Sequence, residues 1–206
     1  MQINTPGLVV ISGKQGSGKT MLVKYIVKNL RYKLRYGIVF CQTAFNTPNC
    51  DYIDEKYIHT KYDPQILYNL MKIQASIPKE RRPLAFIIFD DCIVDSYHND
   101  KWFNQLITQT RHYNVLVIIT TQYVNKLSPM LRENCFQCAI FAADTHRVIN
   151  SLYESYGQSK FDTYNDFKKY LLENTKDHQF IWYDRQQSSY QSLKLPKNIK
   201  CKKLKF

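Results

Sequence analysis

Residues 13–20, with the sequence GKQGSGKT, constrain the fold more than any other stretch of this chain. They match the pattern G-x-x-x-x-G-K-[ST], in which glycines let backbone N–H groups turn inward around a phosphate chain. The pattern carries weight only between a strand and a helix. An apolar run at residues 8–11 precedes the loop, and apolar residues after Thr20 recur at helical spacing without a proline. The stretch therefore predicts a nucleotide-binding loop.

The residues of this loop have distinct expected roles. Those predicted to bind nucleotide are Gly13, Lys14, Gln15, Gly16, Ser17, Gly18, Lys19 and Thr20. Lys19 can reach the β- and γ-phosphates, and the Thr20 hydroxyl can ligate Mg²⁺. We therefore expect ATP and Mg²⁺ as cofactors. The alternative, a chance match in a glycine turn before a surface helix, is disfavoured by the flanking strand and helix.

Strand and helix patterns alternate along the chain. Strands are predicted at residues 8–11, 37–41, 84–89, 115–120, 136–142, 180–183 and 190–195. Helices are predicted at residues 21–30, from Asp63-Pro64 to just before Pro78, and at 99–112, 145–156 and 161–174. A polar and aromatic connection, residues 42–62, separates the second strand from the second helix and carries a turn signal at residues 46–49.

This alternation predicts an α/β fold of the P-loop NTPase type. Its central sheet would be mainly parallel and flanked by helices, and the C-terminal strands would extend it in antiparallel fashion. At 206 residues the chain suits one domain. We expect the ATPase domain to cover residues 1–195 and a basic C-terminal tail to cover residues 196–206.

Charge and hydropathy narrow the classes of partner. The net charge of +12 favours a polyanion such as double-stranded DNA. The lysines near the C-terminus are Lys194, Lys197, Lys200, Lys202, Lys203 and Lys205. That segment is either a solvated, frayed tail or a nucleic-acid contact. No apolar run approaches the ~20 residues of a membrane span, and residues 1–6 do not resemble a signal peptide. A soluble, intracellular protein without a membrane partner is expected.

The cysteines do not predict a metal or disulfide framework. Cys135 and Cys138 form a C-x-x-C pair, but no second pair follows at zinc-site spacing. Cys41, Cys92 and Cys138 fall in or beside apolar strands, where a free cysteine behaves as a small hydrophobic residue. Reduced thiols are therefore expected.

Two acids directly follow the third predicted strand. In open α/β sheets the carboxyl ends of the strands form the ligand crevice, so Asp90 should face the same crevice as the phosphate loop. Asp90 is therefore the predicted second metal ligand beside Thr20. Asp91 is the residue that distinguishes an ATPase, because a second carboxylate can orient and deprotonate the attacking water. Its alternative role is to cap the end of the strand.

Polar residues near the fourth strand complete the predicted site. Gln122 follows that strand and could contact both the γ-phosphate and the attacking water. Arg111 precedes it and could act on a neighbouring subunit as an arginine finger, in trans. Arg132 is the second candidate for that role. Either arginine could instead form an ordinary surface ion pair.

These motifs together resemble the FtsK–HerA superfamily of DNA-pumping ATPases. The stretches that carry the resemblance are GKQGSGKT, IIFDD, RHYNVLVIITTQ and LSPMLREN. Within the superfamily they are most similar to the genome-packaging ATPases of poxviruses, other large DNA viruses and their virophages. The resemblance implies an ATP-driven homo-oligomeric ring of five or six subunits, which moves double-stranded DNA through a capsid vertex. It assigns Asp91, Gln122 and Arg111 to catalysis.

Two other function classes stay open. A nucleoside or nucleotide kinase is disfavoured by Asp91, by Gln122 and by the lack of an arginine-rich lid segment. A nucleotide-dependent assembly or secretion ATPase would keep the same site but would not move DNA, so DNA-stimulated turnover would separate it from a packaging motor.

Overall fold

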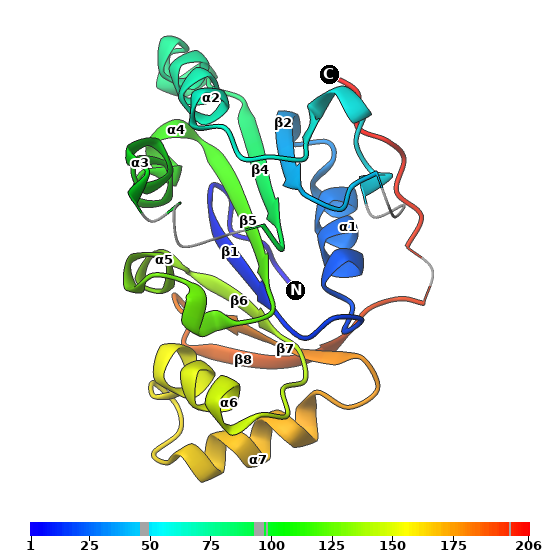
Figure 1. Ribbon diagram of the computed structural model, residues 1–206, viewed down its shortest axis with the longest axis vertical. Helices are drawn as coiled ribbons and strands as arrows, with labels where there is room; N and C mark the ends of the chain where they lie inside the picture. Colours follow the sequence, from blue (N-terminus) through cyan, green and yellow to red (C-terminus); the bar gives the residue numbers. More distant parts are fainter. Residues whose placement is uncertain (46–49, 93–96, 98, 198) are drawn as a thin grey trace.

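Eight strands form one sheet in the order β3-β2-β4-β5-β1-β6-β7-β8 in the computed structural model, which describes all residues except 46–49, 93–96, 98 and 198 (Figure 1). The strands are β1 (Gly7–Ser12), β2 (Leu34–Cys41), β3 (Ile58–His59), β4 (Leu84–Asp90), β5 (Val115–Thr121), β6 (Gln137–Ile140), β7 (Gln179–Asp184) and β8 (Ser189–Lys194). From β3 to β6 all pairings are parallel, whereas β7 and β8 add in antiparallel fashion. The predicted fold class is confirmed.

The helices and short helical turns connect these strands. They are α1 (Lys19–Leu30), η2 (Glu55–Tyr57), α2 (Pro64–Ser76), η3 (Lys79–Arg81), α3 (Lys101–Thr108), α4 (Thr110–Tyr113), η5 (Val124–Lys126), α5 (Pro129–Asn134), α6 (His146–Leu152), η6 (Tyr153–Gly157) and α7 (Tyr164–Asn174). Asp63 caps α2 as expected, because its side chain accepts a hydrogen bond from the Gln65 N–H.

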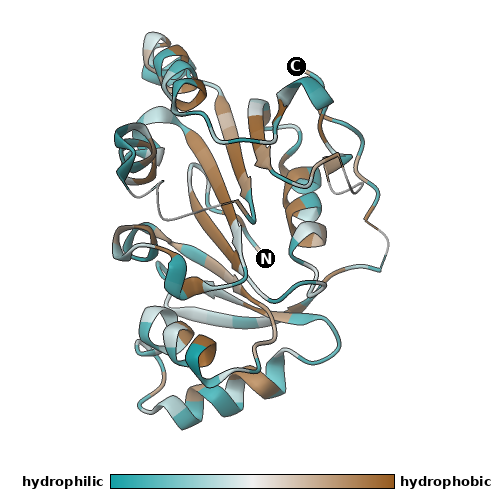
Figure 2. Ribbon diagram, in the orientation of Figure 1, coloured by the Kyte–Doolittle hydropathy of each residue, from teal (hydrophilic) through white to brown (hydrophobic). Residues whose placement is uncertain are grey.

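The sheet is buried on both faces, so its central strands are apolar at successive positions (Figure 2). On one face α1 packs with Leu22, Ile26 and other apolar side chains against alternate residues of the sheet. Figure 1 shows α2, α3, α5 and α6 on the other side. That face holds the larger apolar cluster, which includes Phe89, Phe103 and Phe167.

The strand register aligns the polar residues that end the strands. Cys41 of β2 pairs with Asp90 of β4, and Asp90 pairs with Thr120 of β5. Ser12, the last residue of β1, pairs with Thr121. Because these strands are parallel, their carboxyl ends lie side by side at one edge of the sheet, where the phosphate loop also begins.

Several predicted bounds differ from the structure. The helix predicted at 99–112 is divided into α3 and α4, because Gln109 leaves the helical conformation between them. The helix predicted at 145–156 changes from α6 into the π-helix η6. The connection 42–62 contains η2 and the edge strand β3, which we did not predict, and the turn predicted at residues 46–49 lies outside the described residues.

The C-terminal segment is not frayed along its whole length. It runs back past the α1 side of the sheet (Figure 1), and Leu204 is buried and forms a parallel bridge with Ile53. The Leu204 N–H donates to the Tyr52 carbonyl at 2.7 Å, and the Phe206 ring meets that of Tyr57 edge-on. The lysines next to these anchors, Lys202, Lys203 and Lys205, are exposed. A domain boundary at residue 195 stays a prediction.

No helix in the described part of the chain has both the length and the apolar character needed to cross a bilayer.

Candidate active site

The loop between β1 and α1 is closely packed at its start and open at its tip. A side chain at Gly13 would overlap Ser17 Oγ and the Phe141 side chain, since a Cβ there would lie 2.5 and 2.7 Å from them. Gly16 and Gly18 have φ angles of 75° and 110°, in the left-handed region that favours glycine. Nothing lies within 4 Å of a Cβ built on Gly16. The loop therefore has the backbone conformation and the free space that a phosphate chain requires.

The first turn of α1 is also suited to an anion. Gly18 precedes the helix, no side chain caps its N–H groups, and its first turn holds no acidic residue. Uncapped N–H groups and the helix dipole together favour a phosphate at this position. The Ser17 hydroxyl is buried and has no hydrogen-bond partner among the described residues. It is therefore an additional polar group available to a ligand in the loop.

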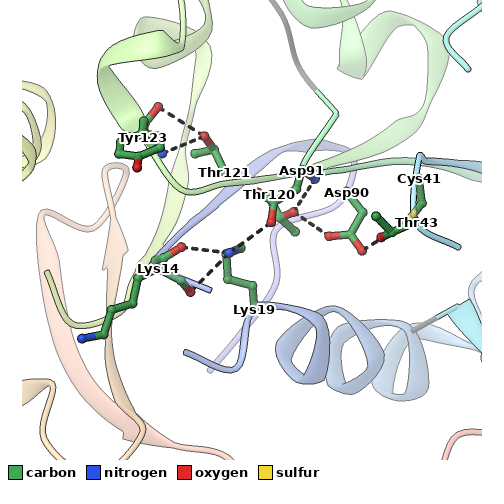
Figure 3. A network of polar contacts seen from close by, with 10 residues as sticks. Lys14, Lys19, Cys41, Thr43, Asp90, Asp91, Thr120, Thr121 and Tyr123 are labelled. Carbon is green, nitrogen blue, oxygen red and sulfur yellow. Dashed lines mark hydrogen bonds and ion pairs between the residues drawn. The ribbon is translucent and has the colours of Figure 1, made fainter. Parts of the chain in front are cut away.

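Lys19 is held beneath the loop rather than extended into solvent. Its ammonium group donates to the Gly13 carbonyl at 2.8 Å and lies 3.2 Å from Asp91 Oδ2 (Figure 3). The side chain is only 6% exposed. Burial strengthens its electrostatic interaction with any phosphate in the loop, since little water screens it.

Asp90 ends β4 at the crevice and is held on both sides. The Thr120 hydroxyl donates to Asp90 Oδ1 at 2.6 Å, and the Cys41 thiol lies 3.8 Å from Asp90 Oδ2 (Figure 3). Burial raises the pKa of the Asp90 carboxyl, while the Thr120 hydrogen bond acts in the opposite direction. A buried carboxylate whose charge is so incompletely compensated is well suited to a cation.

Asp91 has an unusual backbone conformation that turns its side chain toward the loop. Its φ angle is 48°, in the left-handed region, and its N–H donates to Thr120 Oγ1 at 2.9 Å. The carboxylate is 36% exposed and reaches Lys19. A non-glycine residue in this region stores strain, and such strain is frequent at functional sites. Asp91 therefore lies beside the lysine of the phosphate loop, and its role in activating water stays a prediction.

Gln122 borders the same open volume. A cavity of ≈ 580 Å³ lies between the loop and the strand ends. Its lining includes Gln15, Lys19, Thr20, Asp91 and Gln122.

 A neighbouring cleft of ≈ 740 Å³ is lined by residues that include Tyr123, Lys126, Arg132 and Arg147. The structure therefore brings Lys19, Thr20, Asp91 and Gln122 to one cavity, beside Asp90.

A second cavity continues from the outer side of the loop. It has a volume of ≈ 350 Å³, shares Gln15 and Gly16 with the first, and reaches the turn before β7 at Thr175 and His178. Two residues of this turn, Asp177 and His178, have positive φ angles. Its position next to the loop leaves room for the part of a nucleotide that lies beyond the phosphates.

The two predicted arginines lie in different places. Arg111 is exposed on α4, at the edge of the sheet where β5 begins, and its guanidinium stacks on the Phe136 ring at 4.7 Å. Arg111 therefore lies at the amino ends of the strands, whereas the phosphate loop of its own chain lies at their carboxyl ends. Arg132 lines the cleft beside Tyr123, next to the crevice. Both roles in trans stay predictions.

Three neighbours of the acids were missed in the sequence. Thr120 contacts both acids, and Cys41 contacts Asp90. The Cys50 sulfur lies within 4.8 Å of the Cys41 sulfur and of a carboxylate oxygen of Asp90. A hydrogen bond involving Cys50 lowers the pKa of the Cys41 thiol to about 7. A strand ending in Thr-Thr could have indicated Thr120, but no local pattern links Cys50 to the strand ends. All six cysteines are free thiols.

The residues present fit a nucleotide and a divalent cation. The loop offers a backbone cradle, a buried lysine and a helix N-terminus to phosphates. Asp90 and the hydroxyl-bearing Thr20 are oxygen donors of the kind that Mg²⁺ prefers. The chemistry of this donor set therefore agrees with the predicted cofactors.

Several viral proteins have related sequences. The family described as Poxvirus A32 protein matches residues 3–155 of this chain. The uncharacterized protein 075L of Invertebrate iridescent virus 6 is 28% identical over 182 residues, which cover 85% of this chain and 69% of that protein. The uncharacterized protein L437 of Acanthamoeba polyphaga mimivirus is 27% identical over 192 residues, which cover 87% and 66% of the two chains.

Solved structures share the fold. The genome packaging NTPase B204 of Sulfolobus turreted icosahedral virus 2, in complex with AMP, superposes with a TM-score of 0.69 at 16% identity. The match covers 93% of this chain and 98% of B204. The pCW3 conjugation coupling protein TcpA, with ATPγS, gives a TM-score of 0.61 at 12% identity and covers 94% and 61% of the two chains.

The resemblance expected from the sequence motifs is thereby confirmed. The family match includes the phosphate loop, both acids and the glutamine, and it covers well over half of the chain. This chain belongs to the poxvirus A32 protein family.

Proposed function

We propose that this protein is the ATP-hydrolysing subunit of a motor that packages double-stranded DNA into a viral capsid. The observation that carries the proposal is the convergence of Lys19, Asp91 and Gln122 on one cavity beside Asp90, in a chain of this family. The B204 structures support it, because that packaging NTPase has the same fold and was solved with ATPγS and AMPPCP.

Each residue has a defined part in the proposed hydrolysis. The loop N–H groups and Lys19 bind the phosphates and hold the γ-phosphate at the mouth of the cavity. Asp91 orients a water molecule for in-line attack and accepts its proton. Gln122 contacts the same water or the γ-phosphate. When bound, Mg²⁺ would neutralise the charge of the phosphate oxygens, and Thr20 and Asp90 are the residues that would hold it.

The contact between Lys19 and Asp91 gives the site a resting arrangement. The two groups lie 3.2 Å apart, so each offsets part of the charge of the other. A bound phosphate chain competes with Asp91 for the Lys19 ammonium group. Asp91 would then be released to act on water only when nucleotide is present.

The proposed assembly is a homo-oligomeric ring of five or six copies at a capsid vertex. Arg111 is compatible with a ring, because it is exposed at the end of the sheet opposite to the phosphate loop, where a neighbouring copy could reach it. In a ring, several copies with a net charge of +12 each would surround the DNA and attract its phosphates. We place the protein inside the infected host cell or in the virion.

A nucleoside or nucleotide kinase is the main competing activity. In a kinase the acceptor hydroxyl is the nucleophile, so a second acid beside Lys19 would not be needed to activate a water molecule. An assembly or secretion ATPase would share the site, and the DNA measurement at the end of the Discussion separates it from a motor.

Phosphate release from ATP tests the proposed hydrolysis directly. With Mg²⁺ and without any nucleoside acceptor, the wild-type protein should release inorganic phosphate. Asp91→Asn should bind ATP normally but turn over at least ~100-fold more slowly, since general-base catalysis contributes about 10²–10⁴-fold. Lys19→Ala should instead weaken nucleotide binding, because charged hydrogen bonds contribute about 1.5–3 kcal/mol. Normal turnover by Asp91→Asn would exclude Asp91 as the base.

A further inference from the structure

Two cysteine thiols lie beside the acid that is assigned to Mg²⁺. Cys41 ends β2, Cys50 lies within the connection after β2, and Asp90 ends β4. One ligand atom from each of these residues lies within 4.8 Å of the other two. The three side chains are almost fully buried, with Cys41 at 1%, Cys50 at 4% and Asp90 at 9% exposure. The site is empty.

This spacing fits a tetrahedral ion with little movement. Zinc binds thiolates at about 2.3 Å and carboxylate oxygens at about 2.0–2.2 Å, which places neighbouring ligand atoms roughly 3.5–3.8 Å apart. The distance from Cys41 Sγ to Asp90 Oδ2 is already 3.8 Å. Two sulfur ligands and one oxygen ligand form a set that a thiophilic ion accepts and that Mg²⁺, which requires oxygen ligands, does not.

We propose that Cys41, Cys50 and Asp90 form a binding site for a thiophilic divalent cation such as Zn²⁺, which takes Asp90 away from Mg²⁺ and stops ATP hydrolysis. The inference rests on the proposed function in one respect, namely that Asp90 serves the catalytic metal. Binding is a ligand exchange without oxidation or reduction. The ion replaces the two thiol protons, which pass to solvent, and a water molecule completes the four ligands.

The surroundings of the cluster support a bound ion. The Tyr52 hydroxyl lies beside Cys50, is buried, and has no oxygen or nitrogen partner among the described residues. It could donate a hydrogen bond to a metal-bound thiolate, as groups behind metal ligands commonly do. Thr43 is exposed beside Cys41 and lines the same cavity as Asp91, so an ion can enter by that cavity.

The other cysteine pair provides a matched control. Cys135 and Cys138 are also buried and in contact with each other, but no third metal-binding group joins them in the described part of the chain. They lie in the larger apolar cluster rather than beside the acids. Changing one of these cysteines removes a thiol without touching the proposed site.

Inhibition by buffered free Zn²⁺ tests the regulatory claim. With Mg²⁺ in large excess and a phosphine reductant present, Zn²⁺ should inhibit the wild-type ATPase. Cys50→Ser should raise the half-inhibiting Zn²⁺ concentration at least ~10-fold, whereas Cys138→Ser should leave it unchanged. Cys50 is not among the residues assigned to hydrolysis, so the basal rate of Cys50→Ser should be close to that of the wild type. Equal inhibition of Cys50→Ser and wild type would overturn the proposal.

Cadmium binding tests the site without any need for activity. Cd²⁺ added to the reduced protein should give the ultraviolet charge-transfer absorbance of a cadmium thiolate at one equivalent. The band should be retained in Cys138→Ser and lost or strongly reduced in Cys50→Ser. A band that instead depends on Cys138 places the ion elsewhere and refutes the site. If the band behaves as expected but Zn²⁺ does not inhibit, the site exists and the claim that it controls Asp90 is wrong.

Discussion

At the scale of single residues, Thr120 organises the site. Its hydroxyl donates to Asp90 Oδ1 at 2.6 Å and accepts from the Asp91 N–H at 2.9 Å. One buried side chain therefore fixes both the acid assigned to Mg²⁺ and the backbone of the acid assigned to water. The hydrogen bond from the Asp91 N–H to Thr120 helps to hold the left-handed backbone conformation of Asp91.

Asp90 should destabilise the protein when no cation is bound. Burial raises the pKa of this carboxyl. Because the folded-state pKa lies above that of the unfolded chain, the folded protein binds more protons, and the Asp90 contribution to stability falls as pH rises through these pKa values. At neutral pH, Asp90→Asn should therefore raise the unfolding midpoint of the metal-free protein. A gain of 1 kcal/mol would appear as roughly 2–4 °C.

Calorimetry with and without Mg²⁺ and ATPγS checks this prediction. The wild-type protein should gain more stability from Mg²⁺ with nucleotide than Asp90→Asn does, since the carboxylate is then paired with the ion. A lower midpoint for the metal-free Asp90→Asn protein would contradict the account of Asp90.

The sequence predicted these residues to different extents. Lys19, Asp90 and Asp91 could be predicted because each follows a recognisable loop or strand, and parallel strands bring such positions to one edge. Thr120 and Cys50 could not be assigned in this way. Their contacts depend on the register between β2, β4 and β5 and on the path of the connection after β2.

At the scale of elements, local signals were reliable where they were strong. The central strands are apolar over their whole length and were located to within a few residues. The helix predicted at 99–112 was interrupted because Gln109 departs from helical geometry, and neither a proline nor a glycine marks that position. β3 has only two residues, too few for any periodic pattern. Tertiary pairing, rather than local propensity, forms it.

The C-terminal segment combines an anchored end with exposed charge. Leu204 and Phe206 pack on the α1 side of the sheet, so deleting residues 196–206 would remove core contacts as well as lysines. Neutralising the lysines separates the two effects. The variant changes the exposed tail lysines to glutamine, at Lys197, Lys200, Lys202, Lys203 and Lys205. A control of equal charge changes the exposed lysines Lys33, Lys79, Lys168, Lys169 and Lys176.

We expect the tail variant to bind duplex DNA more weakly than the control and to keep its basal ATPase. Each phosphate contact contributes about −0.9 to the slope of log affinity against log salt, so the tail variant should have a flatter slope. Fluorescence anisotropy across a range of salt concentrations measures both quantities. Equal losses in the two variants would mean that the tail has no special role and that only the overall charge matters.

At the scale of the whole molecule, the carboxyl ends and the amino ends of the parallel strands lie on opposite sides of the sheet. The phosphate loop and the acids lie at the carboxyl ends of the strands, and Arg111 lies at their amino ends. A residue so placed cannot reach the nucleotide of its own chain without a large rearrangement. It could reach the nucleotide of a neighbour in a ring, where these two sides meet.

Mixed assemblies test this contribution from a neighbour. Arg111→Ala alone and Asp91→Asn alone should each be nearly inactive. In a mixture, some interfaces pair an intact Arg111 with an intact Asp91, so part of the activity should return. The measurement is ATPase rate against mixing ratio, with co-assembly checked by light scattering. No recovery in proven mixed assemblies would exclude Arg111, and the same experiment with Arg132→Ala would then be decisive for the second arginine.

The most direct test of the account is the ATPase rate with and without double-stranded DNA. The measurement uses the assembled full-length protein, Mg²⁺ and low salt, and compares duplexes of unrelated sequence. A packaging motor should hydrolyse ATP several-fold faster with DNA, with little dependence on sequence because the contacts are to phosphates. The stimulation should fall as salt rises. An assembled protein that hydrolyses ATP at the same rate with and without DNA, and does not bind DNA at low salt, would contradict the motor function.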